Sequence, residues 1–279
     1  SLSSKVTDAK WHDINKDGLK DLVVTTEWDQ PHIFVNNQGE LKEISFPENL
    51  NGLWQTVDFY DIDNDGDEDI LLGNWGLNTK FSIYFDGPLR MYYSDFDRNG
   101  IDETVLAYNR DGVYYPLNTK DELASQMNVM SNRFKDHKSM AGKNIEEVMT
   151  KGSLGEAKAY KVETLASGYL ANENSDFKDF IPFSQEFQLA PVTTFKGINL
   201  NDDKRIIAGG NSYKVNTYHG AYSAFKGLLV EDESSFDFVS ELGIDAFHKQ
   251  IKAIESLRMK NHNLLIIVSN EGQLKTYSY

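Results

Sequence analysis

Asp61-Ile-Asp-Asn-Asp-Gly-Asp-Glu-Asp69 is the stretch that decides the fold, and it lies between Thr56-Val-Asp-Phe-Tyr60 and Ile70-Leu-Leu-Gly-Asn74. Its carboxylates are so closely spaced that they would repel one another, so an ordered loop requires a multivalent cation. Oxygen ligands at alternate positions, with a glycine at position 6 for the sharp turn, suit calcium. The predicted ligands are the side chains of Asp61, Asp63, Asp65 and Asp69 and the backbone carbonyl of Asp67.

The same pattern occurs in two further stretches, Asp13-Ile-Asn-Lys-Asp-Gly-Leu-Lys-Asp21 and Asp95-Phe-Asp-Arg-Asn-Gly-Ile-Asp-Glu103. Three copies make chance a poor explanation, although an acidic surface turn without metal stays open for each copy. We therefore expect about three calcium ions, one in each loop. The further predicted ligands are the side chains of Asp13, Asn15, Asp17, Asp21, Asp95, Asp97, Asn99 and Glu103 and the carbonyls of Leu19 and Ile101.

The residues around these loops predict strands. An EF-hand needs a bidentate Glu at position 12 and a helix on either side. That position holds Val24, Leu72 and Leu106. Each loop instead leads into a short apolar run that is typical of a buried strand.

A strand, an acidic loop of this spacing and a second strand that ends in Gly-Asn together resemble the FG-GAP/VCBS repeat of calcium-binding β-propellers. Three other stretches, Gly73-Asn-Trp-Gly-Leu-Asn78, Thr119-Lys-Asp-Glu-Leu123 and Gly209-Gly-Asn211, are similar to VCBS-repeat proteins common in Bacteroidetes. Those proteins are related to the ASPIC/UnbV and cartilage acidic protein group. The resemblance implies a propeller and an extracytoplasmic location, and it implies no agreed activity.

The spacing of the loops predicts an all-β propeller of four-stranded blades within one domain, 1–279. The second loop begins 48 residues after the first, which is the length of one blade. The third follows after only 34 residues, which predicts a shortened second blade. About five blades can be counted, so the chain forms a small ring or part of a larger one. Because a loop follows Ser1-Leu-Ser-Ser4 so closely, we expect a leader and earlier repeats before it.

A helical insertion is expected at 119–150. Thr119 and Glu122 have the spacing of a capping box, and apolar residues recur at helical intervals as far as Phe134. This pattern predicts one amphipathic helix over 120–134. A second short helix is expected to start at Asn144, because Glu147 lies three residues further on.

Composition restricts the partners. The net charge of −15 argues against nucleic acid, which binds basic surfaces. The chain has no cysteine, so disulfides and thiol chemistry are excluded. No apolar run approaches the roughly 18 residues of a membrane span. Calcium loops of extracellular modules are saturated outside the cytosol, which favours a periplasmic, cell-surface or secreted protein.

The leading functional hypothesis is a non-enzymatic binding or scaffold module that recognises a glycan or a protein. Aromatic residues near predicted turns could contact such a ligand, although each is more often simple packing. They are Trp28, Trp54, Trp75, Tyr114, Tyr115, Tyr213 and Tyr218. The alternative is a hydrolase or lyase with a pocket on the propeller axis, although no catalytic motif is present. A purely structural part of a larger assembly is a third reading.

Overall fold

The computed structural model describes residues 4–45, 49–81, 87–200, 203–213, 215, 220–246, 249–270, 272 and 274–279. The chain forms two compact units, which we call the propeller unit (Ser1–Thr79 and Leu165–Tyr279) and the inserted unit (Lys80–Thr164). The sequence predicts a helical insertion at 119–150 within a single domain. The inserted unit is larger, because the helices share a core with a β-sheet of their own.

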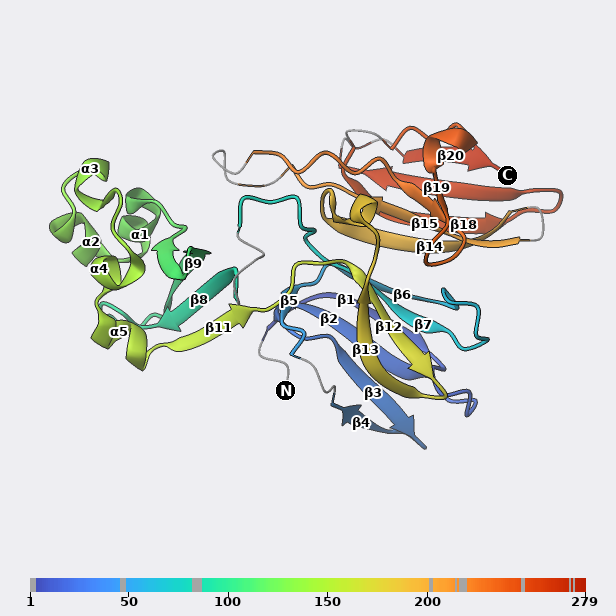
Figure 1. The fold of residues 1–279 in the computed structure, drawn as a ribbon, viewed down its shortest axis with the longest axis horizontal. Helices are drawn as coiled ribbons and strands as arrows, with labels where there is room; N and C mark the ends of the chain where they lie inside the picture. The colour runs from blue at the N-terminus through green and yellow to red at the C-terminus, as the bar shows by residue number, and fades with distance from the viewer. Residues whose placement is uncertain are drawn as a thin grey trace. The chain divides into compact units, whose positions relative to one another are not determined.

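The described residues of the propeller unit form four antiparallel sheets (Figure 1). Sheet 1 contains β1 (Lys5–His12), β2 (Asp21–Asp29), β3 (His32–Asn37), β4 (Glu40–Ile44) and β5 (Gly52–Leu53). Sheet 2 contains β6 (Thr56–Tyr60), β7 (Asp69–Gly73), β12 (Gly168–Glu173) and β13 (Asp176–Pro182). Sheet 3 contains β14 (Val192–Leu200), β15 (Asp203–Gly210), β16 (Leu228–Val230) and β17 (Phe236–Phe238). Sheet 4 contains β18 (Ile251–Arg258), β19 (Asn263–Ser269) and β20 (Leu274–Ser278).

These sheets follow one another as propeller blades do. Their first strands contact each other in the order β1, β6, β14, β18. A separate hydrophobic cluster fills the space between each pair of neighbouring sheets. The fold is therefore of the all-β propeller type, with blades of mostly four antiparallel strands.

Strand β7 explains why the apolar runs after the loops do not alternate with polar residues. Ile70 and Leu72 pack into the cluster between sheets 1 and 2, whereas Leu71 packs into the cluster between sheets 2 and 3. Both faces of the strand are buried, so its three middle positions, 70–72, are all apolar. Gly73 ends the strand, and a Cβ there would lie 2.5 Å from the carbonyl oxygen of Val192 in sheet 3. Glycine thus permits the close approach of the next blade.

The second blade is not shortened, and that prediction was wrong. After β7 the chain leaves sheet 2, forms the inserted unit and returns as β12 and β13 to complete the sheet. Strand β12 pairs directly with β7, with Leu170 opposite Ile70. The 34 residues between the starts of the second and third loops therefore lead from sheet 2 into the inserted unit, and they do not give the length of a blade.

The inserted unit has a four-stranded sheet and five short helices among its described residues. The sheet contains β8 (Leu89–Ser94), β9 (Glu103–Arg110), β10 (Val113–Pro116) and β11 (Lys158–Val162). The helices are α1 (Lys120–Gln126), α2 (Asn128–Arg133), α3 (His137–Met140), α4 (Ile145–Met149) and α5 (Lys151–Glu156). Their apolar side chains pack against Tyr92, Val105 and Ala107 of the sheet.

The helix predicted over 120–134 is divided in two. The backbone of Met127 is extended, with φ −126° and ψ 108°, so α1 ends before it and α2 begins after it. The capping boxes of Thr119 with Glu122 and of Asn144 with Glu147 are confirmed. The predicted apolar face is also buried, because Met127 is 0% exposed and Phe134 is 4% exposed.

Candidate metal centres

The three acidic loops have one backbone shape. Loop 1 (13–21) joins β1 to β2, loop 2 (61–69) joins β6 to β7, and loop 3 (95–103) joins β8 to β9. Positions 4 and 6 of each loop are left-handed, a conformation that glycine and asparagine adopt most easily. The φ values are 57°, 62° and 60° at Lys16, Asn64 and Arg98, and 87°, 97° and 89° at Gly18, Gly66 and Gly100.

The acid at position 9 fastens each loop to its own first turn. Asp21, Asp69 and Glu103 are all buried. Each accepts a hydrogen bond from the backbone N–H of position 2, which closes the loop. The donors are Ile14 at 3.0 Å, Ile62 at 3.0 Å and Phe96 at 2.8 Å. Burial raises the pKa of Asp69 to about 6, against the lowering effect of its backbone hydrogen bonds.

Loop 2 brings three predicted ligands together. Carboxylate oxygens of Asp61, Asp63 and Asp65 all lie within 4.8 Å of one another. Oδ1 of Asp61 is buried and has no hydrogen-bond partner among the described residues. Burial, followed by the neighbouring carboxylates, raises the pKa of Asp63. An orphaned carboxylate oxygen among like charges fits a divalent cation.

Loop 3 forms a second group of this kind. Carboxylate oxygens of Asp95, Asp97 and Glu103 lie within 4.8 Å of one another. Within the described chain, Oδ1 of Asp97 and Oε1 of Glu103 are buried without a hydrogen-bond partner. Asn99 accepts the N–H of Ile101 at 2.8 Å through its side-chain oxygen. Loop 3 therefore also fits a cation, and two of its three clustered acids hold unsatisfied oxygens.

Loop 1 differs from the other two. The described residues of this loop contain no such group of three acids, although Asp13, Asp17 and Asp21 accept backbone N–H groups as the acids of loop 2 do. The Asn15 amide nitrogen donates to Asp17 Oδ2 at 3.2 Å. The ligand roles predicted for three backbone carbonyls, those of Leu19, Asp67 and Ile101, stay predictions. The ligand role of Asp69 also stays a prediction, because Asp69 does not belong to the group of three acids in loop 2.

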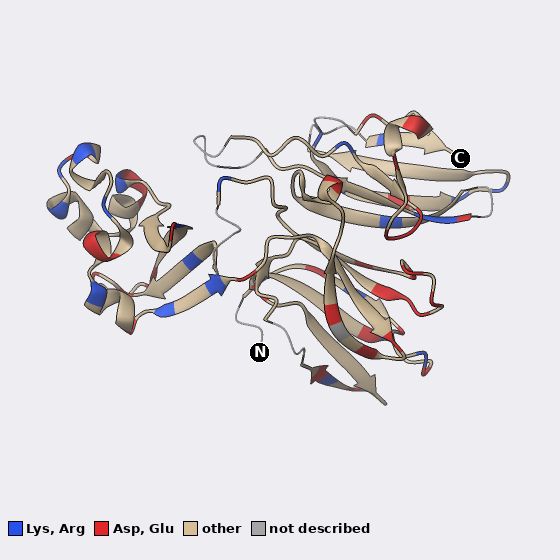
Figure 2. Cartoon of the chain, in the orientation of Figure 1, with Lys and Arg blue, Asp and Glu red and all other residues tan. Residues whose placement is uncertain are grey.

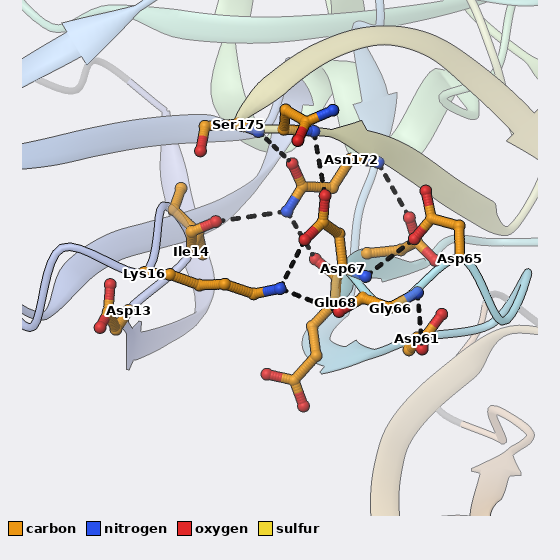
Figure 3. A network of polar contacts seen from close by, with 12 residues as sticks. Asp13, Ile14, Lys16, Asp61, Asp65, Gly66, Asp67, Glu68, Asn172 and Ser175 are labelled. Atoms are coloured by element: carbon orange, nitrogen blue, oxygen red, sulfur yellow. Dashed lines mark hydrogen bonds and ion pairs between the residues drawn. The ribbon is translucent and has the colours of Figure 1, made fainter.

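A lysine from loop 1 contacts loop 2 (Figure 3). Lys16 Nζ donates to the carbonyl oxygen of Gly66 at 2.9 Å and to Asp67 Oδ1 at 2.5 Å. The hydrogen bond from Lys16 lowers the pKa of Asp67. His12 adds a second link, because its Nε2 lies 2.6 Å from Glu68 Oε2 while its ring stacks on Phe59. Sheet 1 thus places positive charge beside the acidic loop of sheet 2.

Asn172 of β12 joins the two loops from the other side (Figure 3). Its Nδ2 donates to the carbonyl oxygens of Ile14 at 3.2 Å and Glu68 at 3.0 Å. Its Oδ1 accepts the N–H of Ser175 at 2.8 Å, and its own N–H donates to Asp69 Oδ1 at 2.9 Å. A strand more than 100 residues further along the chain therefore fixes both loops.

Sheet 3 contacts loop 2 as well. The N–H of Glu233, in the turn between β16 and β17, donates to the carbonyl oxygen of Ile62 at 3.1 Å. Glu233 Oε2 in turn accepts the hydroxyl of Tyr169 at 2.8 Å. Asp and Glu accordingly gather at the loop ends of sheets 1 and 2 in Figure 2. Loop 2 is the point where three sheets of the propeller unit meet.

The aromatic residues considered as ligand contacts occupy different environments. Trp54 is 0% exposed and packs edge-on against Phe180, so it belongs to the core. Trp75 packs edge-on against Tyr222. Trp28 is partly buried and has a φ of 69°. Tyr213 is 41% exposed, Tyr114 lies beneath Arg90, and Tyr115 lines a hollow in the inserted unit. Tyr218 lies outside the described residues.

A hollow of about 360 Å³ lies beside the first strands of sheets 2, 3 and 4. Its lining includes one acidic side chain, Glu68, which is held by His12. Lys204, Arg205 and Arg258 give the rest of its charge. Among the described residues that line this hollow, two acids placed as a catalytic pair are therefore not found.

Sequence reasoning missed Lys16, Asn172 and Glu233. Lys16 left a weak signal, because it is a base at position 4 of a repeat that carries acids at positions 1, 5 and 9. Asn172 and Glu233 left none, since each acts through strand pairing or a turn distant from loop 2 in the sequence. No described helix has the length and apolar character needed to cross a membrane.

Comparisons with known proteins agree with the repeat. Residues 13–72 match the model of the FG-GAP-like repeat family. No curated protein matches the chain. Among solved structures, the crystal structure of BBS1N in complex with ARL6DN is similar at 9% identity and a TM-score of 0.27, over 100% of this chain and 69% of that one. The chain therefore contains an FG-GAP-like repeat, which spans loop 1, loop 2 and the strands from β2 into β7.

Proposed function

We propose that the chain is a calcium-stabilised β-propeller module that acts outside the cytoplasm and binds a glycan or a protein, and that it is not an enzyme. This proposal rests on two groups of three acids, one in loop 2 and one in loop 3. Their buried oxygens lack donors among the described residues, and hard oxygen ligands of this kind suit calcium. Extracellular calcium modules bind at about 10⁻⁴–10⁻³ M, which matches a calcium-rich exterior.

The residues of the chain define what each loop contributes. Asp61, Asp63 and Asp65 hold the ion in loop 2, and Asp95, Asp97 and Glu103 hold it in loop 3. Bound calcium supplies the positive charge that offsets repulsion among these carboxylates. Asp69 ties loop 2 to β12 through the N–H of Asn172. Ordering loop 2 therefore stabilises the strands on both sides of it.

The recognition role rests on the stabilised architecture. Rigid blades hold their connecting loops in fixed positions, and binding residues are commonly placed on loops of rigid scaffolds. Because loop 2 contacts sheets 1, 2 and 3, calcium would preserve the arrangement of several blades at once. Ligand binding should then depend on calcium even where the ligand contacts no ion.

Calorimetric titration of calcium into chelator-treated protein tests the metal sites. We expect Asp63→Asn to weaken one class of site, and we expect Asp111→Asn, which changes a side chain that is 84% exposed, to leave the titration unchanged. A titration without binding heat, and without any effect of calcium on thermal unfolding, would contradict the metal assignment.

Glycan arrays and protein pull-downs, each with calcium and with chelator, test the recognition role. We expect a ligand that is retained in calcium and lost in chelator. If neither method finds such a ligand, the recognition role is refuted, whatever the metal titration shows.

A further inference from the structure

The inserted unit contains a hollow of about 780 Å³, a volume within the usual range of ligand sites. One side is formed by the ends of β9 and β10 and the turn between them, and the other by α3 and residues 141–143. All of its lining residues belong to one compact unit. The geometry of the hollow therefore does not depend on the position of the propeller unit.

Two tyrosines form an aromatic surface in this hollow. Tyr108 and Tyr115 are direct cross-strand partners, so their side chains lie on the same face of the sheet. Their ring centroids are 6.1 Å apart and their planes meet at 36°. Both residues are only partly buried. Tyrosine rings of this kind offer a large apolar surface with a polar hydroxyl group at the edge.

Basic side chains surround the tyrosine pair. Among the described residues, Arg110, Lys120 and Lys143 line the hollow together with a single acid, Asp111. Arg110 lies 4.0 Å from Asp111, and Lys120 is paired with Asp121 at 2.9 Å. Within the described part of the chain, Lys143 has no ion-pair partner and is partly buried. A cation that is held at a concave surface without a counter-charge is suited to an anionic group of a ligand.

The inserted unit, which contains this hollow, is much less acidic than the rest of the chain. Residues 80–164 contain 12 Lys and Arg against 13 Asp and Glu, whereas the remainder contains 16 against 30. Figure 2 shows the basic residues spread over the helices of the inserted unit. A chain with a net charge of −15 repels long polyanions such as nucleic acids. A small anionic ligand can instead bind one locally basic hollow.

We propose that this hollow binds an acidic sugar of a glycan, such as a uronic acid residue. The apolar face of the sugar ring would stack on Tyr108 and Tyr115, and its carboxylate would pair with Lys143 and Arg110. This site supplies the ligand class for the recognition role proposed above, and it rests on that role. It does not involve loops 1 and 2 of the propeller unit; loop 3 leads into β9, the far end of which lines the hollow, so any calcium dependence of this site would arise from loop 3.

The test uses the full chain, calorimetry and a short oligosaccharide that contains glucuronic acid. The matched probe is the same oligosaccharide with its carboxylates reduced to alcohols. We expect the acidic form to bind and the reduced form to bind at least about tenfold more weakly, with an affinity that falls as salt rises. Equal binding of the two forms, or absence of binding by the acidic form, would overturn the proposal.

Variants localise the binding. Lys143→Glu and Tyr115→Ala should each weaken binding by about tenfold or more, while Tyr115→Phe, which keeps the ring and the fold, should retain it. The matched control is Lys158→Ala with Tyr160→Ala. These two residues form a cation–aromatic pair at 4.6 Å in the same unit, and neither lines the hollow. Unchanged binding by Lys143→Glu and Tyr115→Ala would assign the oligosaccharide to another surface.

Two outcomes separate this inference from the general function. If a mononucleotide or an acidic peptide competes more strongly than the oligosaccharide, the hollow serves another ligand class and the inference fails. If the glycan array or pull-down finds a calcium-dependent ligand that the hollow variants still bind, the inference fails while the recognition role stands.

Discussion

Asn172→Ala should separate loop 1 from loop 2 and destabilise the propeller unit. The side chain is 2% exposed and takes part in three hydrogen bonds, to the carbonyl oxygens of Ile14 and Glu68 and from the N–H of Ser175. A net contribution of about 1 kcal/mol per hydrogen bond gives a loss of about 3 kcal/mol in the free energy of unfolding. The loss should persist in chelator, because none of these bonds involves a metal ligand side chain.

Denaturant unfolding followed by tryptophan fluorescence measures this loss. Trp54 is fully buried in the cluster between sheets 1 and 2, so its emission reports on the part of the unit that Asn172 holds together. Asn37→Ala is the control, because Asn37 is exposed in the same unit and should change stability by less than about 0.5 kcal/mol. A loss no larger than that of the control would refute the bridging role.

Three further predictions concern the acidic loops. Chelation should lower the melting temperature, and Asp65→Ala should lower it more than Asn15→Ala in calcium, as differential scanning calorimetry can measure. Burial raises the pKa of Asp69 from its usual 3.8 to about 6, so metal-free protein should lose stability as pH rises through this interval. The calcium-induced gain in melting temperature should consequently be largest above pH 6; a gain independent of pH would contradict this. Lys16→Met should lower the melting temperature in chelator, because the acids of loop 2 lose a counter-charge, yet it should tighten calcium binding in a calorimetric titration, because the variant no longer repels the ion.

The blades could be predicted from the sequence because their determinants are local. A loop of fixed spacing followed by an apolar run determines a turn and a buried strand, so β2, β7 and β9 were expected where they occur. The turn between β3 and β4, in which Gln38 and Gly39 have positive φ, determines the pairing of these strands in the same way. Each of these features depends on residues within one hairpin.

The inserted unit could not be delimited from the sequence, because its boundaries depend on pairings between distant strands. Nothing near Leu170 indicates that β12 pairs with β7 across an insertion. Met127 lies at a perfect helical interval from Leu123, and yet its backbone is extended. Its buried side chain satisfies the apolar pattern without a continuous helix, so periodicity located the core of this unit better than it located the helix.

The three loops have the same turn geometry, but they differ in whether their acids form a metal site. The acid at position 9 closes every loop through the backbone N–H of position 2, so the turn forms in loop 1 even though its acids do not cluster. Orphaned carboxylate oxygens, in contrast, occur only in loops 2 and 3 among the described residues. In loop 1 the side-chain amide of Asn15 donates a hydrogen bond to Asp17, and a cation bound to the same oxygen of Asp17 would have to displace this bond. Because an ion gains most where no hydrogen bond must be broken, loop 1 should bind calcium more weakly than loops 2 and 3.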